Sequence, residues 1–428
     1  MLLPIFSRIS SRVMKNRYVL IPILINIAIL LILLAVVIAS GASYQNMLLR
    51  ADSYYTIADE FAHGGSLLHK FRGPVLPLVF SMLFIFPYGM HPFIRLLLSI
   101  IVSAGTITVL YNLTKKYITG REFLFGSLIF IFNPVYVHWT FRPFPEIYLA
   151  LVLGIFIFSV IRYYRESHIG YLCIAVLSFI LSFFIKPVFV FIPFFLLFAA
   201  LLIKSKKIAA VSVLLLILGI LTYVAQDEFT KVGYEADASR IDKTYEYAHK
   251  TLLISESYWV DYVVRTRQLF KPTLEEYQIE YKDGKSFQEY AQDWFRDFYQ
   301  KYPKANYISM NLYFIYKEPF LFLQKLILSP FFFFSMSART SETIMKLAVS
   351  ILSVILAIIG LNAALRMSKY KKEIILIVFV LIGYASLHLV THAMNRYSLP
   401  ILPYLYVWGG IPLVKSIDWV LSFVKKHP

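Results

Sequence analysis

Two acidic side chains at the ends of apolar segments could do chemistry in this sequence. Asp52 lies in a polar stretch after the first apolar run, and Glu146 directly precedes another apolar run. A carboxylate at either place could act as a general base that takes a proton from a hydroxyl group. Each also has a simpler structural explanation. Asp52 occupies the expected N-cap position of a following helix, and the helix dipole favours a carboxylate such as Glu146 in a first turn.

Basic residues beside the same apolar segments could bind an anionic group. They are Arg72, Arg142, Lys186 and Arg396. Lys186 interrupts a long apolar stretch, where a lysine that extends its charge toward the lipid headgroups is the plainer interpretation. Arg396 precedes the last apolar run, where the helix dipole disfavours a cation, so a phosphate-binding role is attractive. We also predict substrate-binding roles for Tyr55 and His392 in the same polar segments.

The elements that must position these residues are membrane helices. Hydrophobic residues make up 59% of the 428 residues, charged residues 16%, and the mean hydropathy is +0.66. Soluble proteins are less apolar and more charged. Several apolar runs have the length that a helix needs to cross the hydrocarbon core, and an alternating barrel pattern is absent. The predicted spans are 18–39, 92–111, 122–138, 145–161, 169–185, 187–203, 208–225, 343–365, 374–392 and 398–414.

Two further apolar stretches, 73–89 and 319–336, contain prolines or charges. The excess of Lys and Arg on the cytoplasmic side decides whether 73–89 crosses. If it does not, the inner loops of the first half carry eight basic residues and the outer loops two. We therefore predict ten to twelve crossings, both termini in the cytoplasm, and 73–89 as a juxtamembrane or re-entrant helix. Asp52, Glu146, Lys186 and Arg396 then share the extracytoplasmic face.

Three parts of the chain differ in composition. Residues 1–225 form a predicted transmembrane catalytic module, 226–318 an extracytoplasmic soluble loop, and 319–428 a second transmembrane module. The loop carries 13 basic and 16 acidic residues, whereas the rest of the chain carries 29 and 9. The net charge of +17 therefore belongs to short loops beside apolar runs, which indicates contact with anionic membrane lipid and not with nucleic acid.

The sequence lacks strong motifs for binding metals or nucleotides, so it gives no support to metal-dependent or nucleotide-dependent chemistry. The histidines lack metal-ligand spacing, apart from the weak pair His388 and His392, and the single Cys173 lies within an apolar run. Neither a phosphate-binding loop nor a dinucleotide fingerprint is present. We expect no cofactor, and the requirement for a divalent metal stays open.

These residues resemble the GT-C superfamily of membrane glycosyltransferases, in the bacterial branch related to protein O-mannosyltransferases and lipid A aminoarabinose transferases. The resemblance rests on Asp52-Ser-Tyr-Tyr-Thr-Ile-Ala with the proline-bearing 73–89 stretch, on Asn133-Pro134 to Glu146, and on Arg396-Tyr-Ser-Leu-Pro-Ile-Leu-Pro. It covers most of the chain in element order. Some relatives have Asp-Glu in the first loop where this chain has Asp52 and Ser53, so the acceptor class stays open.

The resemblance implies a GT-C-like all-α fold and transfer of a sugar from a polyprenyl-phosphate carrier with inversion. Asp52 would be the base, Glu146 the second acid and Arg396 a contact of the carrier phosphate. The acceptor would be a glycan, lipid or protein, in a multi-pass bacterial inner-membrane protein. A lipid-linked glycan flippase or other transporter, or a glycan polymerase, is the alternative, although transporters more often show paired halves or charges in mid-helix.

Overall fold

The computed structural model describes part of the chain, which consists of two compact units. The described residues are 3–40, 53–67, 73–142, 144–186, 188–232, 280–282, 285–286, 297–298, 300–302, 313, 316–317, 319, 323, 333–334, 340–390 and 395–426. Unit 1 comprises Met1–Tyr234, Ala348–Ala385 and Arg396–Pro428, and unit 2 comprises Glu235–Leu347 and Ser386–Asn395. The predicted division at residues 225 and 318 stays a prediction.

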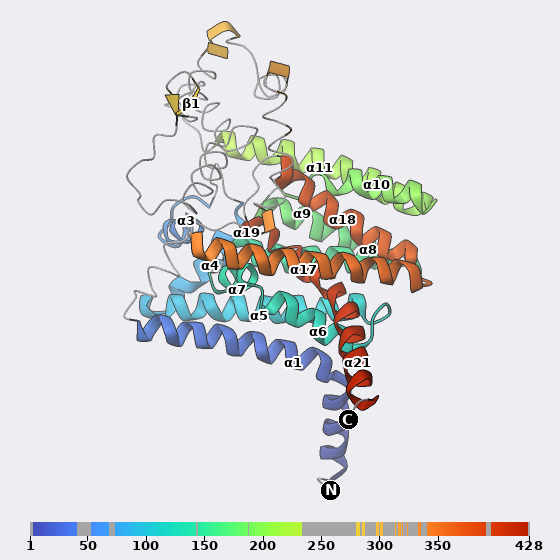
Figure 1. Ribbon diagram of the computed structural model, residues 1–428. Coiled ribbons are helices and arrows are strands. Elements are labelled where there is room, and N and C mark those ends of the chain that lie inside the picture. The colour runs from blue at the N-terminus through green and yellow to red at the C-terminus, as the bar shows by residue number, and fades with distance from the viewer. Residues whose placement is uncertain are drawn as a thin grey trace. The chain divides into compact units, whose positions relative to one another are not determined.

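Long apolar helices build unit 1 (Figure 1), although the first residues of α17 and the last residues of α18 belong to unit 2. They are α1 (Leu3–Ala39), α5 (His91–Thr114), α6 (Gly120–Ile131), α8 (Pro145–Glu166), α9 (Ile169–Ile185), α10 (Ile192–Leu202), α11 (Lys206–Val232), α17 (Thr340–Met367), α18 (Lys371–Val390) and α21 (Gly410–Lys426). By length and composition, five helical segments of the described residues can cross a membrane, or six if one bent pair counts as a single span. The described chain is thus helical, as expected for a membrane protein, and ten to twelve crossings remain a prediction.

One predicted span is broken where the sequence suggested a single helix. The stretch 122–138 forms α6 and a second helix, α7 (Pro134–Phe141), with a bend of 68° between them. Asn133 caps α7, because its side chain accepts a hydrogen bond from the backbone N–H of Val135, and Pro134 occupies the first helical position. Proline at this position starts a helix but cannot continue the preceding one. The segment is therefore a broken span or a re-entrant turn and not one straight helix, and its crossing stays a prediction.

Short helices gather at one end of the long ones (Figure 1). They are α3 (Ser53–Ala62), α4 (Val75–Ser81), α7 and α19 (Asn395–Ser398), with the 3-10 turns η1 (Met82–Ile85) and η2 (Tyr88–Met90). The first two helices pack on each other, and α4 also packs on α9. Together α4 and η1 rise by roughly 18 Å, less than the hydrocarbon thickness of about 30 Å. The helix α10 is no longer than this segment, so the prediction that 73–89 does not cross stays a prediction.

The first short helix, α3, ends at a pair of glycines. Gly64 has a φ of +89°, and its N–H bonds to the carbonyl of Phe61 while the N–H of Gly65 bonds to that of Glu60. These two bonds form a Schellman motif, which requires a left-handed residue that glycine adopts without strain. Inside the helix, Ile57 and Ala58 lie on the buried face.

The two ends of α8 carry separate ionic clusters. Glu146 lies in its first turn and Arg165 in its last, about 28 Å apart along the helix, close to the thickness of a hydrocarbon core. Arg165 makes a bidentate pair with Glu373 of α18, with Nε 2.6 Å from Oε1, and the hydroxyl of Tyr117 donates to Glu373 Oε2 at 2.6 Å. Charged groups thus lie at both ends of α8, as expected for a helix that crosses the membrane. Which end faces the cytoplasm stays a prediction.

Unit 2 is described only in pieces. A short antiparallel hairpin pairs β1 (Glu280–Lys282) with β2 (Lys285–Ser286). The rings of Phe298 and Tyr313 lie 5.2 Å apart, and Phe333 stacks on His388 at 5.9 Å.

Candidate functional site

Glu146 is a buried carboxylate at the start of α8. Pro145 occupies the first helical position, and the Glu146 side chain follows in the same turn with a relative exposure of 1%. Its Oε1 accepts a hydrogen bond from Nζ of Lys186 at 2.9 Å. Lys186 lies directly after α9, and because α8 and α9 pack side by side as consecutive helices, the start of one meets the end of the other. The partner of Glu146 is thus Lys186 and not its sequence neighbour Arg142.

A second cation reaches Glu146 from the last quarter of the chain. Nε of Arg396, in α19, lies 3.8 Å from Glu146 Oε1. The Nη2 group of Arg396 donates to the hydroxyl of Tyr397 at 2.8 Å, and Nζ of Lys186 lies 3.6 Å from the centre of the Tyr397 ring. Phe144 covers the Arg396 guanidinium from another side. We refer to Glu146, Lys186, Arg396 and Tyr397 as the carboxylate–cation cluster.

The carboxylate–cation cluster carries one net positive charge, because two cations surround one carboxylate. Burial alone would raise the pKa of the Tyr397 phenol, but the neighbouring Lys186 ammonium and Arg396 guanidinium outweigh burial and leave this pKa below its ordinary value. Among the described residues, none donates a hydrogen bond to Oε2 of Glu146. A lysine and an arginine that meet at one point are side chains that can contact an anionic ligand such as a phosphate group.

The segment after the first predicted span packs against the same end of α9. The hydroxyl of Tyr54, in α3, donates to the carbonyl of Ile185 at 3.2 Å, one residue before Lys186. A Cβ atom on Gly73 would collide with the carbonyl oxygen of Phe184, so only glycine permits this approach. Two points of the segment between α1 and α5 are thereby fixed to the turn of chain that carries Lys186.

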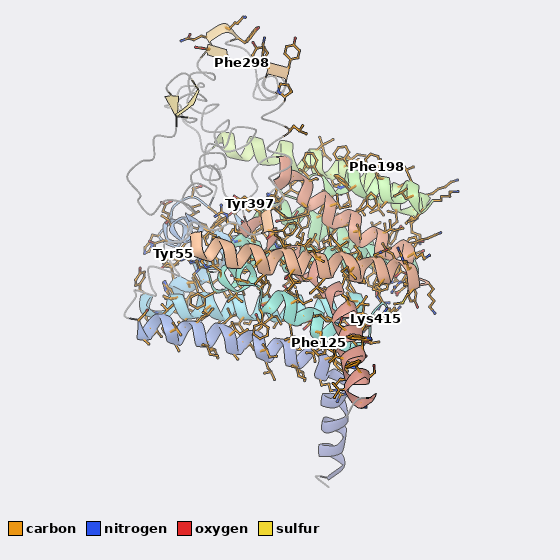
Figure 2. All side chains as sticks on the ribbon, in the orientation of Figure 1. Tyr55, Phe125, Phe198, Phe298, Tyr397 and Lys415 are labelled. Atoms are coloured by element: carbon orange, nitrogen blue, oxygen red, sulfur yellow. The ribbon has the colours of Figure 1, made fainter. Side chains whose placement is uncertain are left out.

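Tyr55 has a hydrogen-bond partner inside the same end of unit 1. Nε2 of His91 lies 2.9 Å from the carbonyl of Phe86, which can only accept, so Nε2 carries the proton and Nδ1 accepts from the Tyr55 hydroxyl at 2.7 Å. Burial, together with Tyr88 and Asp59, raises the pKa of Tyr55 to about 12. Figure 2 shows Tyr55 and Tyr397 toward the end of the helices where α3 and α19 lie, and Lys415 toward the other.

The predicted site residues fall into three groups. Glu146, Lys186 and Arg396 come together as described, and Tyr55 lies beside α5. Arg142 ends α7 and takes no part in the ion pairs described for Glu146. The remaining predictions lie outside the described residues, namely Asp52, Arg72 and His392.

Two residues of this region were not predicted as site residues. Arg95, in the first turns of α5, is fully buried, with its guanidinium 4.5 Å from the centre of the Phe80 ring. An arginine inside the predicted span 92–111 was the available signal, because ionisable residues within membrane spans usually have a role. Tyr397, which contacts both cations, follows Arg396 directly, but its type alone gave no signal.

Neither a metal group nor a relative identifies the chemistry. Within the described ranges, no three His, Cys, Asp or Glu side chains lie close enough to hold a metal ion. No protein-family model matches the chain, and no curated protein matches it.

Proposed function

We propose that this chain is a GT-C-type glycosyltransferase of the bacterial inner membrane. It transfers a sugar from a polyprenyl-phosphate carrier to an acceptor hydroxyl on the extracytoplasmic face, with inversion at the anomeric carbon. The observation that carries the proposal is the carboxylate–cation cluster, where Lys186 and Arg396 lie around the buried Glu146 at one end of α8. A lysine and an arginine at one partly buried site suit the phosphate of a lipid carrier.

In this proposal Asp52 is the general base. Its carboxylate takes the proton of the acceptor hydroxyl while that oxygen forms a bond to the anomeric carbon, and the bond between this carbon and the phosphate oxygen breaks. The carrier leaves as polyprenyl phosphate. Asp52 directly precedes α3, whose Tyr54 bonds to Ile185 beside Lys186, and this proximity supports a base close to the cluster.

Lys186 and Arg396 stabilise the negative charge that develops on the departing phosphate. Such stabilisation is strongest where water is excluded. Glu146 holds the two cations together in this scheme. Because it pairs with both, it is a poorer proton acceptor than an isolated buried carboxylate, which favours Asp52 as the base. Arg72 and Arg142 are further candidate contacts of the carrier, and Tyr55 and His392 of the substrates.

The proposed topology has ten crossings, with both termini in the cytoplasm. Helices α9, α10, α11 and α18 supply the crossings beyond those that length and composition already identify. At the proposed cytoplasmic end, Lys207 of α11 donates to the carbonyls of Tyr163 and Tyr164 at the end of α8. Arg121 of α6 pairs with Asp418 of α21 at 2.6 Å. Basic residues at this end agree with the charge rule.

Purified wild type and Asp52→Asn, reconstituted in vesicles, test the proposal. The donors are a panel of polyprenyl-phosphate-linked sugars, and the acceptor is the glycan and lipid fraction of the host envelope. We expect Asp52→Asn to lower transfer by roughly 10²–10⁴-fold, as for loss of a general base. The control is Asp59→Asn, which changes a half-exposed carboxylate of α3, the helix that follows Asp52, and Asp59 lies close to His63. Unchanged transfer by Asp52→Asn would remove Asp52 from the chemistry.

The same vesicles separate the alternative functions. A flippase or transporter would move a labelled lipid-linked glycan across the bilayer without changing its covalent structure. A polymerase would give products that lengthen by repeated units, whereas the proposed enzyme adds one sugar and releases polyprenyl phosphate. Movement without transfer would contradict the enzymatic proposal.

A further inference from the structure

The last helix, α21, exposes a continuous set of large apolar side chains. Its first turns are buried, but from Lys415 onward almost every described side chain is exposed. Trp419 has a relative exposure of 68%, Val424 57% and Leu421 51%. Apolar side chains of this size, grouped on one short helix, mark a surface that another molecule or a membrane covers.

The exposed part of α21 has two distinct faces. At 100° per residue, Lys415, Asp418, Ser422 and Lys425 share one side, and the apolar residues Ile417, Val420, Leu421 and Val424 occupy the opposite side. Trp419 and Phe423 lie on the border between the faces and stack on each other at 6.1 Å. Aromatic residues at such a border are typical of helices that lie in the headgroup region.

The contacts of α21 argue against a continuation of this helix across the hydrocarbon core. Length and composition alone would allow residues 402–425 to cross. However, Asp418 pairs with Arg121 in the first turn of α6, and Nζ of Lys415 lies 3.8 Å from Sδ of Met367, the last residue of α17. Residues 415–425 therefore lie beside the ends of other helices. Figure 1 shows α21 running across the direction of α1, α5 and α17.

Unneutralised positive charge surrounds this helix. At the end of unit 1 where α21 lies, each described acidic side chain has a local partner. The pairs are Asp418 with Arg121, Glu166 with Arg162, and Glu373 with Arg165, and Glu122 takes part in the capping box of α6. By contrast, the exposed cations of the same loops and helix ends are Lys115, Lys116, Lys369, Lys371, Lys372, Lys415 and Lys425. Clustered basic residues beside an amphipathic helix attract anionic lipid headgroups.

We infer that residues 415–426 form an interfacial helix that lies on the bilayer and binds anionic lipid headgroups. The apolar face around Val420 and Val424 enters the boundary between headgroups and acyl chains, while Lys415 and Lys425 contact lipid phosphates. This surface is separate from the carboxylate–cation cluster, because it lies at the opposite end of the helices in unit 1. The inference does not depend on the proposed transferase activity.

Spin labels on single cysteines test the placement of α21 in the full-length protein. Cys173 is the only cysteine, so Cys173→Ser gives a background for Val420→Cys, Val424→Cys and Ser422→Cys. In nanodiscs of phosphatidylcholine and phosphatidylglycerol, accessibility to oxygen and to a polar nickel reagent reports depth. An interfacial helix places labels 420 and 424 at the same depth, about 5–10 Å below the headgroups, and label 422 in water.

Two other results would overturn the inference. A membrane-crossing helix would separate labels 420 and 424 by about 6 Å in depth, because each residue rises 1.5 Å. Low accessibility of label 424 to both reagents would mean that protein covers the apolar face, either a second copy or a different chain.

The lipid charge is tested with the same labels. Replacing phosphatidylglycerol by phosphatidylcholine should move label 424 toward water, and Lys415→Gln with Lys425→Gln should at least halve that change. Lys301→Gln, which removes an exposed positive charge in unit 2, is the matched control and should leave the change intact. A depth that is independent of lipid charge would contradict the role of the lysines.

Discussion

Nζ of Lys186 and Oε1 of Glu146 lie 2.9 Å apart, although forty residues separate them in the chain. The pair closes the end of the α8–α9 hairpin, and Arg396 approaches the same carboxylate oxygen from α19. One carboxylate thus connects three segments that are far apart in the sequence. Removing one partner of a buried ion pair leaves an uncompensated charge, which costs more than the pair itself contributes.

Lys186→Gln should therefore destabilise the protein, by less than the about 3–5 kcal/mol typical of a buried charge that loses its only partner, because Arg396 stays beside Glu146. The double variant Glu146→Gln with Lys186→Gln should be more stable than the sum of the single changes predicts, because the interaction between Lys186 and Glu146 is then lost only once. Unfolding in detergent measures both effects. Lys204→Gln, an exposed lysine in the turn before α11, serves as the control. Additive effects of Glu146→Gln and Lys186→Gln would show that the two side chains do not interact.

The Tyr397 phenol should ionise at a lower pH than an ordinary tyrosine. Lys186 and Arg396 hold the pKa of Tyr397 down despite its burial. Between this lowered pKa and about pH 10, the folded state has lost the proton that the unfolded state still binds, so stability rises with pH. This contribution is complete above about pH 10 and is lost as the pH falls through the folded pKa.

The phenolate absorbance difference between wild type and Tyr397→Phe measures this titration. Lys186→Gln should move the midpoint of this Tyr397 titration to higher pH, because one of the two cations is lost. A titration that is the same with and without Lys186 would contradict the assignment of the shift to this lysine.

Local features of the sequence predicted the helices well. The predicted span 145–161 starts where α8 starts, at Pro145, and the end of α3 at Gly64 has the same kind of local cause in glycine chemistry. The bend after α6 was missed, because proline is tolerated inside many membrane helices and Pro134 alone does not distinguish a kink from a break.

The long-range pairing of charges could be predicted only in part. Positive charges in the loops suggested that Glu146, Lys186 and Arg396 share one face, and the structure brings these three together. The sequence also allowed a pair between Glu146 and its neighbour Arg142. The packing of α9 on α8 brings Lys186 to Glu146 and so makes Lys186 the partner. No local pattern in the sequence encodes that packing.

A glycine in α8 makes room for a tyrosine of the last quarter of the chain. A Cβ atom on Gly154 would overlap the hydroxyl of Tyr404, which donates to the carbonyl of Ala150 at 2.8 Å. Gly154→Ala should therefore displace the Tyr404 ring and cost about 1–3 kcal/mol, as for other overpacked sites. Unfolding in detergent measures the loss. Gly105→Ala is the control, because a Cβ there meets Leu151 at an ordinary 3.4 Å. Equal effects of the two substitutions would contradict the close approach.

Asn26 should stabilise the contact between the first helix and its neighbours. Its Nδ2 group donates to Oγ of Ser103 in α5 at 2.7 Å, and the same oxygen lies 2.8 Å from the hydroxyl of Tyr136 in α7. Hydrogen bonds between membrane helices contribute about 0.6–2 kcal/mol each. We expect Asn26→Ala to lower the free energy of unfolding by this amount, and Asn26→Ala combined with Ser103→Ala to lose less than the sum of the two.

Asn112→Ala is the matched control for Asn26→Ala. The Asn112 side chain bonds only within α5 and its end, to the carbonyl of Thr108 and to Lys115, so its loss should leave the helix contacts intact. Thermal unfolding in detergent, followed by circular dichroism, compares the two variants under one condition. If Asn26→Ala costs no more than Asn112→Ala, the bond between α1 and α5 contributes nothing to stability. The first helix is then held by the packing of its apolar side chains alone.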